Sequence, residues 1–175
     1  MNLILCGLPG SGKSTTGKLL AEKWGWETLE TDREVEKRYA ERSGESLTCR
    51  EIYKKIGEKE FRQLENKILS SLNVERHIID IGGGTLNDPD NVKAVKALGS
   101  LVYLNVSDKK KLYLQMTHKG VPAYLDQANP FTSFLKLVAE REPIYEQAAD
   151  IKIDVTGLKP AEVVDKITGS VKYGS

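Results

Sequence analysis

One eight-residue segment near the N-terminus limits the possible folds of this chain more than any other feature. Residues 7–14 read Gly-Leu-Pro-Gly-Ser-Gly-Lys-Ser and match the pattern G-x-x-x-x-G-K-S/T at every position. A short apolar run, residues 3–6, precedes the segment, and an amphipathic stretch, residues 13–24, follows it. Glycines permit a tight loop whose backbone N–H groups face an anion, and the helix that follows adds its positive dipole end. The segment therefore predicts a phosphate-binding loop, with an ordinary glycine-rich strand–helix turn as the alternative.

The residue types in this loop predict how it would hold Mg-ATP. We expect Lys13 to reach the β- and γ-phosphates and to be catalytic, and we expect the Ser14 hydroxyl to ligate Mg²⁺. The nucleotide-binding residues that we expect in the loop are Gly7, Gly10, Ser11, Gly12, Lys13, Ser14 and Thr15.

Short apolar runs alternate with longer amphipathic stretches along the rest of the chain. Strands are expected over residues 3–6, 26–29, 77–81, 101–106 and 151–155, and helices over 13–24, 32–39, 59–72, 88–98, 131–147 and 161–171, with a mixed stretch over 113–129. This alternation predicts an α/β fold with a five-stranded parallel sheet flanked by helices, in one domain over residues 1–175. Ligands of such sheets bind beyond the carboxyl ends of the strands. We therefore expect the segments after Cys6, Leu29, Ile81 and Val106 to surround one cleft.

The charge balance excludes some classes of partner. Lys and Arg total 26 against 25 Asp and Glu, so no bulk charge attracts nucleic acid or a membrane surface. Cys6 and Cys49 are far apart and are expected to be reduced thiols. No apolar run approaches a signal peptide or the ~20 residues of a membrane helix. We expect a cytoplasmic monomer that binds small molecules.

Four further segments resemble the shikimate kinase family, in family order and with near-family spacing. They are Glu30-Thr31-Asp32, Gly57-Glu58-Lys59-Glu60-Phe61-Arg62-Gln63-Leu64-Glu65, Gly82-Gly83-Gly84 and Arg141-Glu142-Pro143-Ile144-Tyr145. The resemblance implies a P-loop fold of the nucleoside-monophosphate-kinase-like type, with Mg²⁺ as the metal. It also implies transfer of the γ-phosphoryl group of ATP to shikimate, a step of aromatic amino-acid biosynthesis.

The resemblance also implies how the acceptor is bound. Arg62 and Arg141 would grip the acceptor carboxylate with paired hydrogen bonds, and Asp32 would orient the attacking hydroxyl or act as a general base. Gly82, Gly83 and Gly84 would offer backbone contact where a side chain would collide.

Each of these assignments has a structural alternative. Asp32 opens a predicted helix, and the alternative is that it is only an N-cap, a role compatible with the functional one. Arg62 lies in a charged helix and would form a solvated ion pair with Glu58 or Glu65. The glycine run would simply end a strand.

Two acidic residues are candidates for organising Mg²⁺ alongside Ser14. Glu30 stands where the family has the first aspartate of Asp-x-Asp, and it can act through water. Asp80 lies near the end of the apolar strand over residues 77–81, where the family has a small neutral residue. An aspartate at that place resembles the Mg²⁺-organising aspartate of other P-loop proteins, and the alternative is a turn cap.

The segment near residues 116–129 matches the mobile lid of the family but lacks its arginine. Val121 stands at the arginine position before Pro122, and Leu114 stands where an upstream basic residue packs near the adenine. One interpretation is that Lys119 or His118 supplies the missing charge and that Lys119 contacts the acceptor. The other is that the acceptor is a different small hydroxylated anion, such as a sugar acid or nucleotide, or that the chain is a nucleotide-binding module with little turnover.

Overall fold

A five-stranded parallel sheet forms the centre of the computed structural model, which describes residues 1–118 and 120–171. Its order is β2-β3-β1-β4-β5, and every neighbouring pair is parallel. The strands are β1 (Asn2–Cys6), β2 (Glu27–Glu30), β3 (His77–Asp80), β4 (Gly99–Asn105) and β5 (Ile151–Asp154). The α/β fold expected from the alternating pattern is confirmed.

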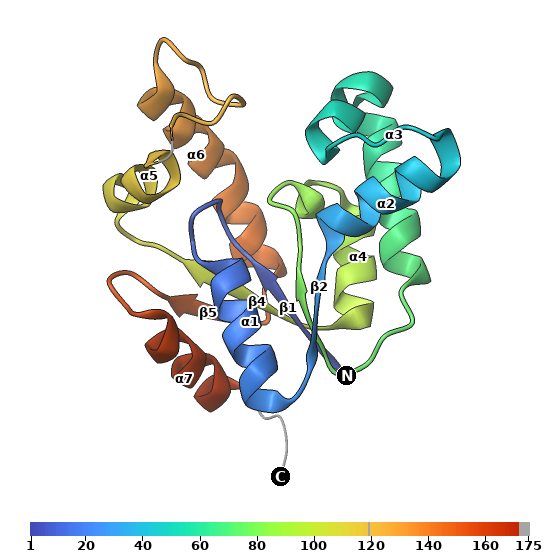
Figure 1. Ribbon diagram of the computed structural model, residues 1–175. Helices are drawn as coiled ribbons and strands as arrows, with labels where there is room; N and C mark the ends of the chain where they lie inside the picture. Colours follow the sequence, from blue (N-terminus) through green and yellow to red (C-terminus); the bar gives the residue numbers. More distant parts are fainter. Residues whose placement is uncertain (119, 172–175) are drawn as a thin grey trace.

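Helices cover both faces of this sheet, which explains why the central strand β1 is buried along its whole length. On one face lie α1 (Lys13–Trp24) and α7 (Pro160–Ser170), and on the other lie α4 (Pro89–Leu98) and α6 (Pro130–Ala148) (Figure 1). All five residues of β1 are buried, as is typical of a parallel strand that is covered on both sides. The same core includes Leu101, Val102 and Phe134.

A pair of helices beside the carboxyl edge of the sheet has a small apolar cluster of its own. Helices α2 (Thr31–Ser43) and α3 (Cys49–Ser71) pack together around Val35, Ile52, Phe61 and Ile68. In Figure 1 this pair stands on one side of the carboxyl edge, and α5 (Lys109–Thr117) stands on the other side.

Several element boundaries differ from the sequence expectation, among them the end of α2 at Ser43 and the start of β4 at Gly99, and the largest differences are in α3 and α5. Helix α3 begins at Cys49 rather than Lys59, because Thr48 and Glu51 form a capping box and a kink at Gly57 (φ 82°) joins two helical segments. Helix α5 begins at Lys109, after an N-cap at Asp108, whereas residues 113–129 were expected to be mixed. The short 3₁₀ helix η1 (Thr85–Asn87) was also not expected.

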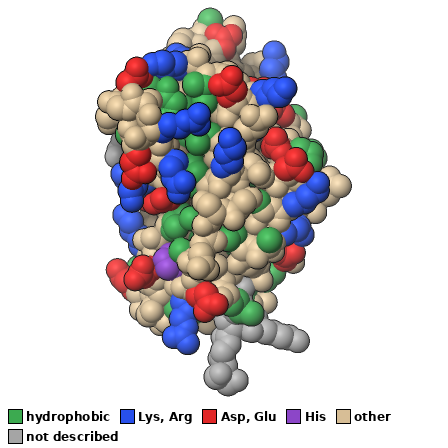
Figure 2. Space-filling model, turned by 90° about the vertical axis from the view of Figure 1, so that its right-hand side faces the viewer, with side chains coloured by type: hydrophobic (Ala, Val, Ile, Leu, Met, Phe, Trp, Pro, Cys, Tyr) green, Lys and Arg blue, Asp and Glu red, His purple; other side chains and the backbone are tan. Residues whose placement is uncertain are grey.

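One face of the molecule reflects the balanced composition of the chain. Acidic and basic side chains are interspersed on the face drawn in Figure 2, with no single-sign patch across it. Within residues 1–118 and 120–171, no helix combines the length and the apolar character that crossing a membrane requires. Cys6 is buried in β1 and Cys49 is half-buried at the start of α3, and both are free thiols.

Candidate functional site

The phosphate-binding loop connects β1 to α1 and depends on its glycines. A Cβ atom at Gly7 would lie 2.7 Å from the carbonyl oxygen of Leu104, and Gly10 and Gly12 have φ angles of 83° and 87°. Only glycine adopts this backbone without strain. The Ser11 hydroxyl oxygen is buried without a hydrogen-bond partner in the described part of the chain, as expected of a group that a ligand oxygen would satisfy. The loop therefore fits a polyphosphate.

Lys13 and Ser14 begin α1 and lie where the loop meets the neighbouring strand. The Lys13 ammonium donates a hydrogen bond to the carbonyl oxygen of Gly7 at 3.1 Å, which holds the charge over the loop. The Ser14 hydroxyl donates to Asp80 Oδ2 at 2.7 Å. This bond joins the phosphate loop to the end of β3.

Asp80 and Glu30 are partners in the register of β3 and β2, so their carboxylates lie at the same edge of the sheet. Burial raises the pKa of Asp80, Glu30 raises it further, and Lys13 and the Ser14 hydrogen bond act in the opposite direction. Glu30 also accepts a hydrogen bond from Arg33 at 3.0 Å. The turn-cap alternative for Asp80 is unnecessary, because its partner is Ser14.

The donors at this edge suit Mg²⁺ better than a metal that needs a full protein cage. In the described part of the chain, no three or more His, Cys, Asp or Glu side chains converge on one point. Mg²⁺ keeps several waters and is commonly held by one or two carboxylates together with substrate phosphates. Ser14, Asp80 and Glu30 fit that pattern.

Asp32 lies in the first turn of α2 and faces the same region. The N-cap of α2 is Glu30, so the interpretation of Asp32 as the cap is wrong. The carboxylate is accessible from the cavity, yet burial, together with Glu65 and Asp80, raises its pKa to about 6 against the opposing effect of Lys13. Asp32 is therefore an ionised acceptor at neutral pH and takes up a proton only a little below it.

The glycine run after β3 faces the three predicted acceptor-binding side chains one by one. A Cβ atom on Gly82 would lie 2.5 Å from Asp32 Oδ1, and one on Gly83 would lie 2.6 Å from an Arg141 guanidinium nitrogen. A Cβ atom on Gly84 would lie 2.6 Å from an Arg62 guanidinium nitrogen. The run does more than end a strand, since each position is filled by a different functional side chain. Residues from α2, α3 and α6 are brought together around it.

Arg62 is held by a buried polar network and is not a solvated surface residue. It forms an ion pair with Glu65 at 2.6 Å, and the side chains of the two are only 12% and 6% exposed. Thr85 donates to the other oxygen of Glu65 at 2.8 Å, and Asn91 donates to the first at 3.4 Å. Glu65 thus fixes the direction of Arg62, a role that the sequence indicated only as one of two possible ion pairs.

Arg141 is positioned beside a buried tyrosine that sequence reasoning missed as a site residue. Tyr145, one turn further along α6, donates its hydroxyl proton to the carbonyl oxygen of Gly83 at 2.5 Å. The Nε atoms of Arg141 and Arg62 are both buried without a partner in the described part of the chain. Buried guanidinium donors without partners fit an anionic ligand beside the glycine run.

A cavity of about 240 Å³ connects the metal side of the site with the glycine run. It is lined by Pro9, Lys13, Ser14, Glu30, Asp32, Asp80, Ile81, Gly82 and Gly83. The predicted catalytic and metal residues therefore meet in one space together with Gly82 and Gly83, whereas Arg62 and Arg141 do not line it.

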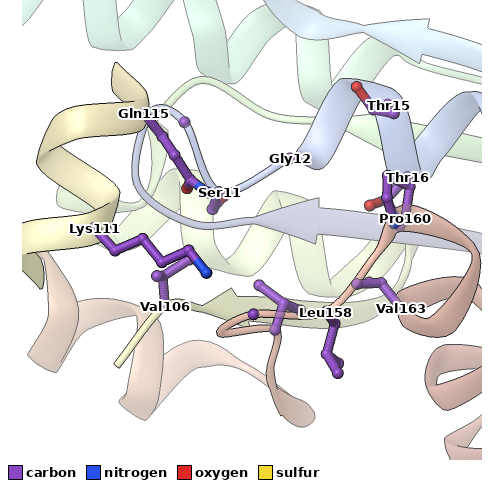
Figure 3. Close-up of a pocket in the computed structure, with 13 residues that line it drawn as sticks. Ser11, Gly12, Thr15, Thr16, Val106, Lys111, Gln115, Leu158, Pro160 and Val163 are labelled. Atoms are coloured by element: carbon purple, nitrogen blue, oxygen red, sulfur yellow. The ribbon is translucent and has the colours of Figure 1, made fainter. Parts of the chain in front are cut away.

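A second cavity, of about 270 Å³, lies on the other side of the phosphate loop (Figure 3). Gly10, Ser11, Gly12 and Thr15 line it, as expected for nucleotide-binding residues. Its remaining walls come from α5 and from the segment between β5 and α7, including Lys111, Gln115, Leu158 and Pro160. Sequence reasoning missed these walls because α5 was not expected.

The predicted lid begins in the last turn of α5 and reaches across to the α2–α3 pair. Arg50 on α3 donates a hydrogen bond to the carbonyl oxygen of Ala123 at 2.8 Å. His118 is exposed and Val121 is 37% exposed, while Lys119 lies outside the described residues. Leu114, at the position of the upstream basic residue, is 58% exposed.

Comparison with known proteins identifies the family. The family model of shikimate kinase matches residues 9–172. The chain belongs to the shikimate kinase family. A shikimate kinase of Thermodesulfovibrio yellowstonii is 32% identical over 95% of this chain and 92% of its own length. A shikimate kinase of Hahella chejuensis is 34% identical over 98% of this chain and 86% of its own length.

Solved structures of the same family share this fold. Shikimate kinase from Acinetobacter baumannii, solved in complex with shikimate, matches with a TM-score of 0.83 and 28% identity, covering 97% of this chain and 91% of that one. The P-loop fold of the nucleoside-monophosphate-kinase-like type, implied by the resemblance in the sequence, is confirmed.

Proposed function

We propose that this protein is a shikimate kinase, which transfers the γ-phosphoryl group of ATP to a hydroxyl of shikimate and gives ADP and shikimate 3-phosphate. Family membership over nearly the whole chain supports the reaction class. The observation that carries the acceptor assignment is the close approach of Asp32, Arg62 and Arg141 to the glycine run, where a Cβ atom would lie only 2.5–2.6 Å from each of them. This arrangement suits a compact acceptor that has a carboxylate and hydroxyl groups.

At the nucleotide end of the site, the phosphate loop, Lys13 and the Mg²⁺-binding residues act on the phosphates of ATP. The phosphate loop supplies backbone donors, and Lys13 supplies the charge that balances the transferred phosphoryl group. Ser14, Asp80 and Glu30 would hold Mg²⁺, which neutralises charge on the phosphates when it is bound.

At the acceptor end, arginine side chains bind the carboxylate and an aspartate orients the attacking hydroxyl. Arg62 and Arg141 bind the carboxylate, and a planar guanidinium can do this with two parallel hydrogen bonds. Asp32 accepts a hydrogen bond from the attacking hydroxyl and directs its oxygen toward the phosphoryl group. Because phosphoryl transfer depends mainly on positioning and electrostatics, orientation is the main contribution of Asp32.

The segment over residues 116–129 closes over both ligands in this proposal, within one kinase domain. Closure excludes water, which would otherwise accept the phosphoryl group. The hydrogen bond between Arg50 and Ala123 supports contact between the lid and α3. Lys119, or His118 beside it, supplies the positive charge that Val121 lacks. The enzyme acts as a cytoplasmic monomer in this proposal. Light scattering of the purified protein measures its molar mass and so tests the monomeric state.

Measuring ADP release with a panel of acceptors tests the proposal. The panel contains shikimate, gluconate, a nucleoside monophosphate and a reaction without acceptor. We expect rapid ADP release only with shikimate, and none with Lys13→Ala, which removes the charge partner of the γ-phosphate. Turnover with gluconate or the monophosphate, but not with shikimate, would show that the acceptor is a sugar acid or a nucleotide instead. ATP binding without turnover on any acceptor would support the nucleotide-binding module.

A further inference from the structure

The cavity beside the phosphate loop contains a cation that none of the predicted site residues accounts for. Among the described residues that line this cavity, Lys111 is the one charged side chain. Figure 3 shows the Lys111 side chain extending from α5 into the middle of the cavity, between Val106 and Leu158. The other walls are the phosphate loop and the segment that leads into α7.

The start of α5 fixes the backbone position of Lys111, and the side chain spans the cavity from there. The Asp108 carboxylate caps α5 and accepts a hydrogen bond from the backbone N–H of Lys111 at 2.9 Å. The ammonium reaches the far wall, because it lies 3.8 Å from a Cβ atom placed on Gly157. Gln115 follows Lys111 by four residues and lines the cavity from the same helix face. No carboxylate in the described part of the chain pairs with the Lys111 ammonium, so its charge is available to a ligand.

We infer that Lys111 is a nucleotide-binding residue of this chain, and that its ammonium lies against the purine base of ATP. This inference rests on the proposed use of ATP. The phosphates are accounted for by the loop and by Lys13, which leaves the base and ribose for the adjoining cavity. Val106, Leu158 and Pro160 give that cavity apolar walls suited to a flat ring. A cation above an aromatic face is attracted to its π-electrons.

Lys111 also provides a positive charge on the side of the site where Leu114 and Val121 are uncharged. Leu114 and Val121 carry no charge, and Leu114 is 58% exposed rather than part of the cavity wall. Lys111 lies one helical turn before Leu114 and does line the cavity. The nucleotide can therefore be held by a cation from a different position of the same helix.

Calorimetric binding of ADP to the full chain, without any acceptor, tests this inference. Lys111→Met keeps much of the length of the side chain and removes its charge, and Lys111→Arg restores the charge. The matched control is Lys110→Met, because Lys110 is exposed on the same turn and does not line the cavity. We expect Lys111→Met to weaken ADP binding about 5- to 10-fold, within the range of a partly desolvated cation–π contact. Lys111→Arg and Lys110→Met should bind within about 2-fold of the parent.

Steady-state kinetics then separate a ligand contact from a general structural effect. Lys111→Met should raise the KM for ATP by a similar factor while the KM for the acceptor stays unchanged. Equal ADP affinity of Lys111→Met and the parent would overturn the inference, and so would equal losses in Lys111→Met and Lys110→Met. If the parent itself fails to bind ADP, the proposed use of ATP fails with it. If ADP binds but shikimate is not phosphorylated, only the acceptor assignment fails.

Discussion

Replacing Asp32 with Asn should inactivate the enzyme and stabilise the fold at the same time. Asp32 lies among Glu65, Asp80 and Glu36, and burial with these charges raises its pKa from 3.8 to about 6. A raised carboxyl pKa means that the native state holds its proton more tightly than the unfolded chain does. Keeping Asp32 ionised therefore costs folding free energy above pH 6, and the cost disappears as pH falls below about 4.

The size of this cost follows from the shift. At about 1.4 kcal/mol per pKa unit, a rise from 3.8 to about 6 corresponds to about 3 kcal/mol. Because the Asp32 carboxylate is accessible from the cavity, solvent screening reduces the expected effect to about 1–2 kcal/mol. Asn keeps the shape of the side chain and removes its charge. We expect Asp32→Asn to raise the free energy of unfolding by about 1–2 kcal/mol at pH 8 and by much less at pH 4.

Denaturant unfolding without ligands, at pH 8 and at pH 4, measures this difference. Asp165→Asn is the control, because the Asp165 side chain is 73% exposed and pairs with Lys23 on the surface. In parallel, kcat/KM for the acceptor should fall below pH 6 in the parent, because a protonated Asp32 no longer orients the attacking hydroxyl. Asp32→Asn should lower kcat by about 10²-fold, the scale expected when a reacting group loses its orientation. A variant that is no more stable than the parent at pH 8, or that gains equally at pH 4, would refute the electrostatic reasoning.

Three further substitutions probe the acceptor side. Gly84→Ala fits the backbone there (φ −103°, ψ −1°) but places a Cβ atom 2.6 Å from Arg62, so the guanidinium must shift within its buried ion pair with Glu65. The acceptor KM should rise about 10-fold, and unfolding experiments should show a lower stability than the parent has. Arg141→Lys should lower kcat/KM for the acceptor at least ~10-fold and leave the ATP affinity measured by calorimetry constant. Loss of ATP binding with intact acceptor binding would contradict the assignment of Arg141 to the acceptor. Val121→Arg should preserve or raise steady-state activity with shikimate, whereas abolished transfer would argue against the shifted charge of the lid.

The phosphate loop and the acceptor residues could be predicted because their residue types are tied to local chemistry. Three glycines in left-handed or strained backbone, followed by Lys13 and Ser14, have few other uses. The positions of Asp32, Arg62 and Arg141 came from the family resemblance. Helical periodicity alone would have made Arg62 a surface residue, because its burial depends on Glu65, Thr85 and Asn91.

The start of α3 and the cavity residues of α5 were not predicted from the sequence. Thr48 and Glu51 have the spacing of a capping box, a signal for the start of α3 that the sequence analysis did not use, and the structure accommodates Gly57 in the same helix as a kink. The contributions of Lys111 and Gln115 depend on α5, whose buried contacts come mainly from Leu112. A nine-residue helix with one fully buried residue leaves a weak periodic signal.

The glycine run also determines which parts of this site can be redesigned. Its three positions face side chains from three separate helices, α2, α3 and α6, so the wall of the acceptor pocket can be altered on one side at a time. The run itself has no such freedom, because a methyl group at any of its positions would lie within 2.6 Å of a side-chain atom. A library aimed at new acceptors should therefore vary residues 62 and 141, which grip the acceptor carboxylate in our proposal, and keep Asp32 and residues 82–84 constant.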